Sequence, residues 1–290
     1  MSRSANAHSM RIAERAATVW YGKAAHIAQR HEIAIGVVAS ASLIRMDHRN
    51  TATAVAAWEA LDGNAIRDSF DRIWTYRWLE QPYLVHAARL LRDWISEDHA
   101  SQTWAAARAL MIAVLEEGIL ELTGSEDPAQ RCDADVLGAV VTHMRAGKAR
   151  TVLGEHHTPP DIAATLAAIL AGGQLEKLPA AGSSFADICA GTGGLLRATA
   201  DRIRQLGGDP ADYRWHVNDL DPLAAACSAV NAITWGLGNH VLVSCADALV
   251  DGNCTEREIP VREAALAHHA RVVRDATRLA TALQLTKEVA

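Results

Sequence analysis

The sequence lacks the features that mark membrane and secreted proteins. No apolar run reaches the roughly 20 residues that span a bilayer, and the first residues contain no apolar stretch typical of a signal peptide. The five cysteines are scattered and form no Cys-x-x-Cys pair, which argues against a disulfide framework and against a zinc site. We therefore expect a cytoplasmic protein with no membrane contact and no bound metal.

Basic charge is scarce as well. The 290 residues include 28 Lys and Arg against 34 Asp and Glu, a formal net charge of −6 at pH 7. Such a chain has no general attraction to nucleic acid, so any DNA contact needs a local basic patch or a basic partner. The densest basic spot is Arg145, Lys148 and Arg150, which we interpret as solvated linker, with phosphate contact as the alternative.

Apolar residues at three- and four-residue steps predict helices in the first half of the chain. The predicted segments are 51–63, 64–81, 82–98 and 101–124, the last one capped by Ser101. This region holds six of the eight tryptophans, for which we expect core packing, with a stacking platform for nucleic acid as the alternative. We assign residues 1–150 to an α-helical domain.

The second half predicts three strand–helix units. The strands are 185–190, 214–220 and 240–247, and helices follow each of them, the last from about residue 260. Strands separated by such helices pair in parallel, so residues 151–290 predict a shortened, open α/β sheet of the Rossmann-like type. The last helix is expected to pack on the sheet, and a dimer seam is the alternative.

A glycine turn, Gly191-Thr192-Gly193-Gly194, follows the first strand and precedes a helix. No Gly-Lys-Ser/Thr follows it, which excludes a P-loop, and the third glycine of the dinucleotide fingerprint is missing. Asp187 before the turn would repel a pyrophosphate but attract an ammonium group. S-adenosylmethionine carries that ammonium and no phosphate, and its carboxylate can bind the amides at a helix start.

Two more acids end the other predicted strands. Asp219 can accept from both ribose hydroxyls, and Asp247 from the exocyclic amine of adenine. In open α/β sheets ligands bind beyond the carboxyl ends of the strands, where all three acids stand. The alternative is that Asp219 and Asp247 are turn and cap residues.

Residues 153–170, 185–200, 216–238 and 241–249 resemble the successive cofactor motifs of DNA adenine-N6 methyltransferases. The nearest resemblance is to the methylation subunit of type I restriction–modification systems and its small actinobacterial relatives. It implies a helical domain before a Rossmann-like methyltransferase domain, and S-adenosylmethionine as cofactor, with Thr158 and Pro159 at its methionine end. The expected cofactor-binding residues are Thr158, Pro159, Asp187, Cys189, Gly191, Thr192, Gly193, Asp219, Leu220 and Asp247.

One motif of this family is missing. Asn-Pro-Pro followed by Tyr or Phe, expected after the third strand, does not occur, and Asn253 has neither the prolines nor the ring. In the family this motif binds the adenine amine and stacks on the flipped base. The catalytic residues are therefore unknown.

We accordingly expect an S-adenosylmethionine-binding protein of a restriction–modification or phage-defence system, with the catalytic half missing or supplied by a partner. The partner would also make the DNA contact, in a homo- or hetero-oligomer. The alternatives are a non-catalytic cofactor-sensing or regulatory module, and a methyltransferase for a small molecule or RNA. With three strands, the first has an open edge, which we expect the last helix, the N-terminal domain or another subunit to cover.

Overall fold

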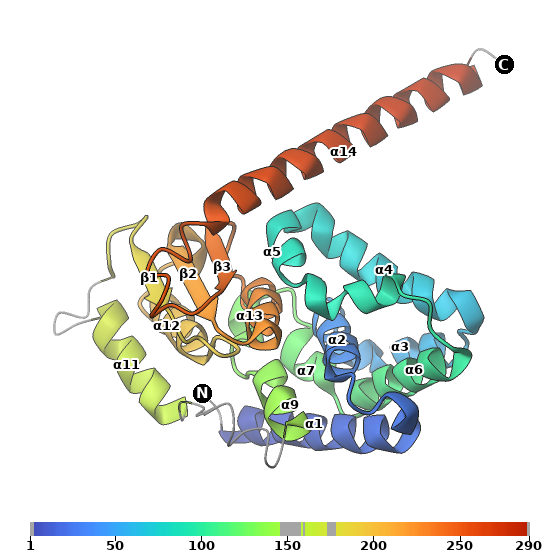
Figure 1. Ribbon diagram of the computed structural model, residues 1–290, viewed down its shortest axis with the longest axis horizontal. Helices are drawn as coiled ribbons and strands as arrows, with labels where there is room; N and C mark the ends of the chain where they lie inside the picture. Colours follow the sequence, from blue (N-terminus) through green and yellow to red (C-terminus); the bar gives the residue numbers. More distant parts are fainter. Residues whose placement is uncertain (1–2, 146–157, 159, 173–177, 289–290) are drawn as a thin grey trace.

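A computed structural model describes residues 3–145, 158, 160–172 and 178–288 (Figure 1). It shows a mixed α/β protein that is mostly helical and has one small parallel sheet. The helices of the first half are α1 (Arg3–Lys23), α2 (His31–Ser42), α3 (Thr51–Glu59), α4 (Gly63–Glu80), α5 (Pro82–Ala87), α6 (Ser101–Glu116), α7 (Ile119–Thr123), α8 (Pro128–Arg131) and α9 (Val136–Met144). The elements of the second half are α11 (Pro160–Gly172), β1 (Ser184–Asp187), α12 (Gly194–Gln205), β2 (Arg214–Asp219), α13 (Pro222–Thr234), β3 (Val241–Cys245) and α14 (Glu258–Glu288).

The tryptophans of the helical half pack mainly in its core, as expected. Trp20, Trp58, Trp74 and Trp94 are buried, and the two others are half-buried. The Trp74 indole N–H donates to the Ser40 hydroxyl at 2.9 Å. These rings stabilise the helical body by apolar burial.

The predicted helix over 82–98 is broken after Ala87 by two 3₁₀ turns, Arg89–Leu91 and Asp93–Ser96. The cause is a close approach to α2. A Cβ on Gly36 would lie 2.4 Å from the Leu91 carbonyl oxygen and 2.6 Å from the Trp94 indole nitrogen. Packing of this segment against a glycine thus overrides its helical periodicity.

The predicted helix over 101–124 is divided at Gly118, which has a left-handed φ of 87°. Ser101 is not its cap, because Ala100 stands at the cap position and no side chain there bonds the helix start. The helical pattern on both sides of Gly118 is otherwise as predicted.

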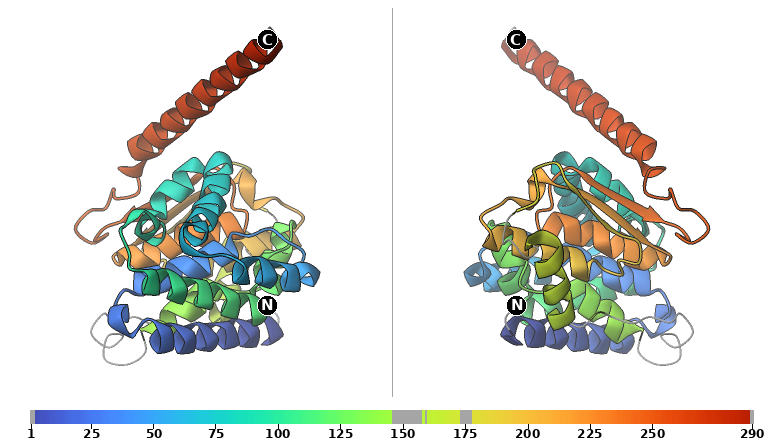
Figure 2. Two further views of the ribbon diagram at one scale, coloured as in Figure 1. Left: turned by 90° about the vertical axis from the view of Figure 1, so that its right-hand side faces the viewer. Right: turned by 90° about the vertical axis from the view of Figure 1, so that its left-hand side faces the viewer.

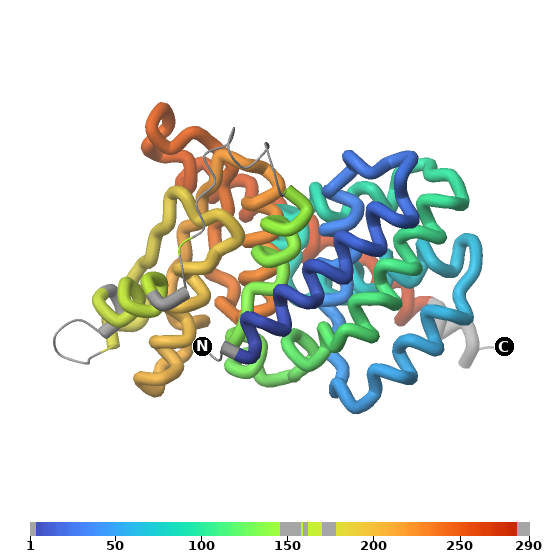
Figure 3. Tube along the Cα trace, turned by 90° about the horizontal axis from the view of Figure 1, so that it is seen from below, coloured from blue at the N-terminus to red at the C-terminus, as the bar shows by residue number. Residues whose placement is uncertain are grey.

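A buried helix, α9, directly precedes the basic spot that we interpreted as linker. α9 packs against α1 and α2, and most of its side chains are in the core. Arg145 at its end forms an ion pair with Asp221, while Lys148 and Arg150 lie outside the described residues. One cluster of buried apolar residues extends from α1 to β3. Figure 3 shows the first-half helices beside the sheet and its helices, and the division at residue 150 stays a prediction.

The three strands form a parallel sheet in the order β1-β2-β3, as predicted. Phe185 pairs with Trp215, and Trp215 with Val241. α13 lies between the sheet and the first-half helices, contacting β2 and β3 as well as α2, α5 and α9. α12 contacts β1 and is covered by α11 (Figure 1).

The two edges of the sheet differ. At β3, the Tyr83 hydroxyl from α5 accepts from the Val243 N–H at 2.9 Å and lies 3.3 Å from the Val243 carbonyl, to which it donates. Burial raises the pKa of Tyr83, so the hydroxyl stays protonated. A side chain thus replaces a fourth strand at this edge.

The edge of β1 has no such cover among the described residues. The Arg214 N–H donates to the Ser183 carbonyl, and strand alternation then directs the backbone groups of Ser184 and Ala186 away from β2. Both residues are exposed. The expectation that the last helix or the N-terminal domain covers β1 is wrong here, because α14 and α5 contact β3 instead.

The last helix does not pack along the sheet. Only the start of α14 contacts β3 and α5, and every residue from 270 to 282 is exposed, so the helix projects from the body (Figures 1 and 2). Tyr83 and α5 already occupy the β3 edge, which leaves α14 no sheet surface to follow. No described helix combines the length and the hydrophobicity needed to cross a bilayer.

The hydrogen bonds between Tyr83 and Val243, which cap the edge of β3, can be tested by removing the Tyr83 hydroxyl oxygen. Tyr83→Phe leaves the buried Val243 N–H without its acceptor, and should lower the free energy of unfolding by about 1–3 kcal/mol. Tyr76→Phe on α4 is the control, because Tyr76 is 59% exposed; it should change stability by less than about 0.5 kcal/mol. Urea unfolding followed by circular dichroism measures both, and equal stabilities would refute the cap.

Candidate functional site

The carboxyl ends of the three strands bring the predicted acids to one edge of the sheet. β1 ends at Asp187 and β2 at Asp219, while Asp247 stands two residues after β3. The strands are adjacent and parallel, so their ends meet at the same edge. Asp187 and Asp219 interact, since the charge of Asp219 helps to raise the pKa of Asp187.

The glycine turn after β1 depends on two left-handed residues, Gly191 with φ 56° and Gly193 with φ 95°. A Cβ on Gly193 would lie 3.1 Å from the Trp235 ring, so packing also excludes a side chain there. A Cβ on Gly191 would meet no atom within 4 Å. The backbone at Gly191 therefore borders open space that a ligand can approach.

Hydrogen bonds from β2 and α13 fix this turn. The Ala190 N–H donates to the Asn218 carbonyl at 2.9 Å, and the Gly191 N–H donates to Asp219 Oδ2 at 2.7 Å. The Ser228 hydroxyl donates to the Gly191 carbonyl at 2.7 Å. Asp219 Oδ1 accepts from the Asp221 N–H at 2.9 Å, yet each carboxylate oxygen can accept more than one bond. Asp219 thus holds the turn and keeps acceptor capacity for a ligand.

Asp135 is a functional residue that the sequence reasoning missed. Its carboxylate accepts from the Thr192 hydroxyl at 2.6 Å and from the Asn231 amide at 3.0 Å. It also caps α9 by accepting from the Gly138 N–H at 2.7 Å. The Asn231 amide donates further to the Thr192 carbonyl at 2.8 Å. An acid directly before a predicted helix signals a cap, but nothing in the sequence connects it to a turn 57 residues later.

Asn218 is the second missed residue, and it joins all three strand ends. Its Nδ2 donates to the Ile188 and Ala246 carbonyls, both at 3.0 Å. Its Oδ1 accepts from the Ala246 N–H at 3.1 Å and from the Ser244 hydroxyl at 2.8 Å. Asn218 is fully buried, so these bonds satisfy its amide. The only signal in the sequence was its place directly before Asp219 at the end of a predicted strand.

The remaining predicted site residues differ in their exposure and in their hydrogen bonds. Cys189 and Leu220 are exposed, whereas Thr192 is buried and directs its hydroxyl to Asp135. Asp247 is exposed, and its Oδ1 accepts from the Leu249 N–H at 3.0 Å, as in the turn role kept as an alternative. Thr158 is exposed, and Pro159 lies outside the described residues.

The charges at this edge suit a cationic ligand group. Burial is the first cause that raises the pKa of Asp187, and the neighbouring Asp219 charge adds to it; a bond from the Cys189 N–H opposes both. Within the described part of the chain, no ion pair involves Asp187 or Asp219. A bound cation would relieve the repulsion between the two carboxylates.

This repulsion has a measurable cost in the free protein. Asp187→Asn removes the charge but keeps an oxygen that accepts from Cys189, so we expect a higher melting temperature at pH 7. A raised native pKa means that the native state binds more protons than the unfolded state between the two pKa values, so this carboxylate costs stability above that window. The gain should disappear below about pH 4.

Thermal unfolding across pH 3–8 tests this expectation. Asp98→Asn serves as the control, because Asp98 is exposed on the helical half, and its melting temperature should follow that of the parent. A melting temperature of Asp187→Asn at or below the parent value at pH 7 would contradict the electrostatic account.

Comparison with known proteins adds one finding. Residues 134–261 match the family model described as N-6 DNA methylase, which spans α9, the glycine turn, all three strands and the start of α14. Neither the curated proteins nor the solved structures gave a match. The matched range begins one residue before Asp135 and confirms the resemblance seen in the sequence motifs. Residues 134–261 of the chain are thus similar to the N-6 DNA methylase family.

Proposed function

We propose that this chain binds S-adenosylmethionine as part of a DNA adenine-N6 methylation system, in a cytoplasmic restriction–modification or phage-defence setting. The observation that carries the proposal is the fixed glycine turn, where a Cβ on Gly191 would meet no described atom, beside two carboxylates that form no ion pair with a described residue. An N-6 DNA methylase domain is the expected place for this cofactor. When bound, the cofactor supplies a methyl group activated by a sulfonium.

Different residues of the chain would bind different groups of the ligand. We assign the ammonium to Asp187 and the carboxylate to the backbone amides at the start of α12. We assign the ribose hydroxyls to Asp219, which two backbone N–H groups already orient. We assign the adenine ring to Asp247, the methionine end to Thr158 and Pro159, and the walls of the site to Cys189, Thr192, Gly193 and Leu220.

A pair of glycine variants tests the binding site. Gly191→Ala would place a methyl group in the open space that the ligand needs, so binding of S-adenosylmethionine should weaken by at least about tenfold. Gly207→Ala at the far end of α12 is the matched control: it too has a positive φ, 83°, and open space around its Cβ. Both carry a similar backbone cost, about 1–2 kcal/mol.

Isothermal titration calorimetry with S-adenosylmethionine, and separately with NAD, gives the readout. We expect the parent and Gly207→Ala to bind S-adenosylmethionine with equal affinity and to show no heat with NAD. Equal weakening in the two glycine variants would assign the effect to stability, and no binding by the parent would overturn the proposed function.

The acceptor side of the reaction calls for residues that these 290 residues do not include, because no Asn-Pro-Pro sequence occurs. We propose that a partner subunit supplies them through the open edge of β1. A strand added parallel to β1 would pair with the outward backbone groups of Ser184 and Ala186. Its carboxyl end would then lie beside the Gly191 turn, where sheets of this kind bind their ligands.

Methylation assays distinguish a methyltransferase completed by a partner subunit from a non-catalytic cofactor-sensing module. The chain alone should form no N6-methyladenosine from labelled cofactor and mixed-sequence DNA, because nothing aligns the adenine amine. Adding a polypeptide that carries Asn-Pro-Pro-Tyr, encoded next to this gene, should restore the product. Ala186→Pro removes an outward N–H, which edge strands tolerate, and should abolish that restoration; Ala186→Thr keeps the N–H and should not.

Robust methylation by the chain alone would show that a replacement for the missing motif exists within it. Cofactor binding without restoration by any such partner would favour the non-catalytic module.

A further inference from the structure

The polar face of α14 carries three arginines in one row. Between residues 264 and 286 the charged side chains are Arg271, Arg274, Arg278 and a single acid, Asp275. All four are exposed. A spacing of three and four residues places the arginines on one face of the helix.

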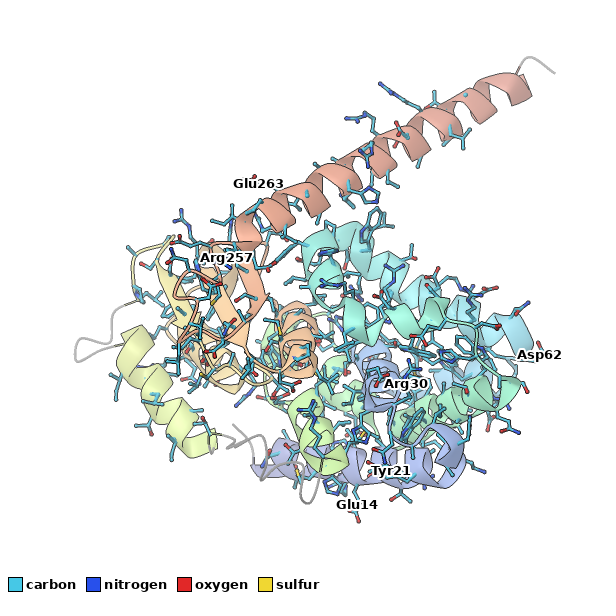
Figure 4. All side chains as sticks on the ribbon, viewed as in Figure 1. Glu14, Tyr21, Arg30, Asp62, Arg257 and Glu263 are labelled. Carbon is cyan, nitrogen blue, oxygen red and sulfur yellow. The ribbon has the colours of Figure 1, made fainter. Side chains whose placement is uncertain are left out.

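This row points away from the body. His269 faces the body, since its ring packs on Trp78 at 4.7 Å between centroids and its Nε2 lies 3.1 Å from the Leu79 carbonyl. At 3.6 residues per turn, the three arginines lie within about 40° of the direction opposite His269. The helical spacing thus places them on the side of α14 opposite His269, in a chain whose net charge is −6. Figures 1 and 4 show that this part of α14 extends from the body.

Little neutralises these guanidinium groups. Arg278 is 3.8 Å from Asp275, with side chains 75% and 60% exposed, and such pairs are weak in water. Arg271 contacts only the neutral acceptor His268 Nδ1 among the bonds found, at 3.0 Å. Thr277 and Thr281 turn their hydroxyls back to helix carbonyls. The arginine row therefore keeps its positive charge available.

We propose that the row formed by Arg271, Arg274 and Arg278 docks α14 on the phosphate backbone of duplex DNA. The row spans about 10.5 Å along the helix axis, and phosphates of one strand are spaced about 3.4 Å apart along the duplex axis, so three of them lie within its length. Guanidinium groups bind phosphates in this way irrespective of base sequence. This surface deepens the proposed function, which requires DNA near the cofactor site.

Fluorescence anisotropy with a labelled 24-base-pair duplex of mixed sequence tests the docking. Three neutralised phosphates predict a slope of about −2.7 for the logarithm of affinity against that of salt, or roughly 40-fold weaker binding at 200 mM than at 50 mM. The triple variant R271Q/R274Q/R278Q should lose most of that slope and bind at least tenfold more weakly at 50 mM. Replacing the same three residues by Lys should preserve the slope.

The control variant R15Q/R67Q/R72Q makes the same change in net charge at exposed arginines of α1 and α4. It should bind the duplex like the parent, and circular dichroism should show unchanged helix content in every variant. Equal weakening in the control, no duplex binding by the parent at 50 mM salt, or binding to anionic phospholipid vesicles but not to duplex would each overturn the proposal.

Calorimetry with S-adenosylmethionine keeps this test separate from the proposed function. The α14 variants should retain parental cofactor affinity, because the three arginines lie in the exposed, projecting part of α14, beyond its contacts with α5 and β3. Duplex binding without cofactor binding would support the docking of the arginine row on DNA and overturn the cofactor proposal alone. Cofactor binding without duplex binding would support the cofactor proposal and overturn the docking of the arginine row.

Discussion

The hydrogen bonds of Asp135 are the constraint on which the candidate site depends. One half-buried carboxylate caps α9, holds the Thr192 hydroxyl and holds the Asn231 amide. It thereby joins the helical half, the glycine turn and α13 at a single point. Removing it would leave three donors without an acceptor, and each unsatisfied buried donor costs about 1–3 kcal/mol. The helical half thus adds its own support to a turn that β2 and α13 also hold.

The same dependence appears at the edges of the sheet. A three-stranded parallel sheet has two edges with unpaired backbone groups, and here the helical half closes one of them through Tyr83. Growth beyond β3 is blocked, while the outward groups of β1 stay accessible. An exposed edge invites pairing with another chain. The fold therefore directs any further strand to the side of the sheet where the glycine turn lies.

Local signals made much of this structure predictable. The strand–turn–helix pattern around Gly191 located β1 and α12, and the acids Asp187 and Asp219 marked the ends of two strands. Long-range contacts were not readable. The break after Ala87 results from a contact with Gly36, and the role of Asp135 results from a turn far along the chain. Asn218 looked like one polar residue in a strand, although its amide joins three strand ends.

The site has one side that is rigid before any ligand arrives. Its turn is held by Asp219, Ser228, Asn231 and Asp135, so a ligand need not order this backbone, and less entropy is lost on binding. The charge pattern has the opposite character, because burial, and after it the neighbouring Asp219 charge, raises the pKa of Asp187 and disfavours its charged form. A ligand with a positive group therefore gains from relief of that repulsion as well as from its direct contacts. Preorganised backbone and unpaired charge together favour capture of a cation-bearing ligand over a phosphate-bearing one at this edge of the sheet.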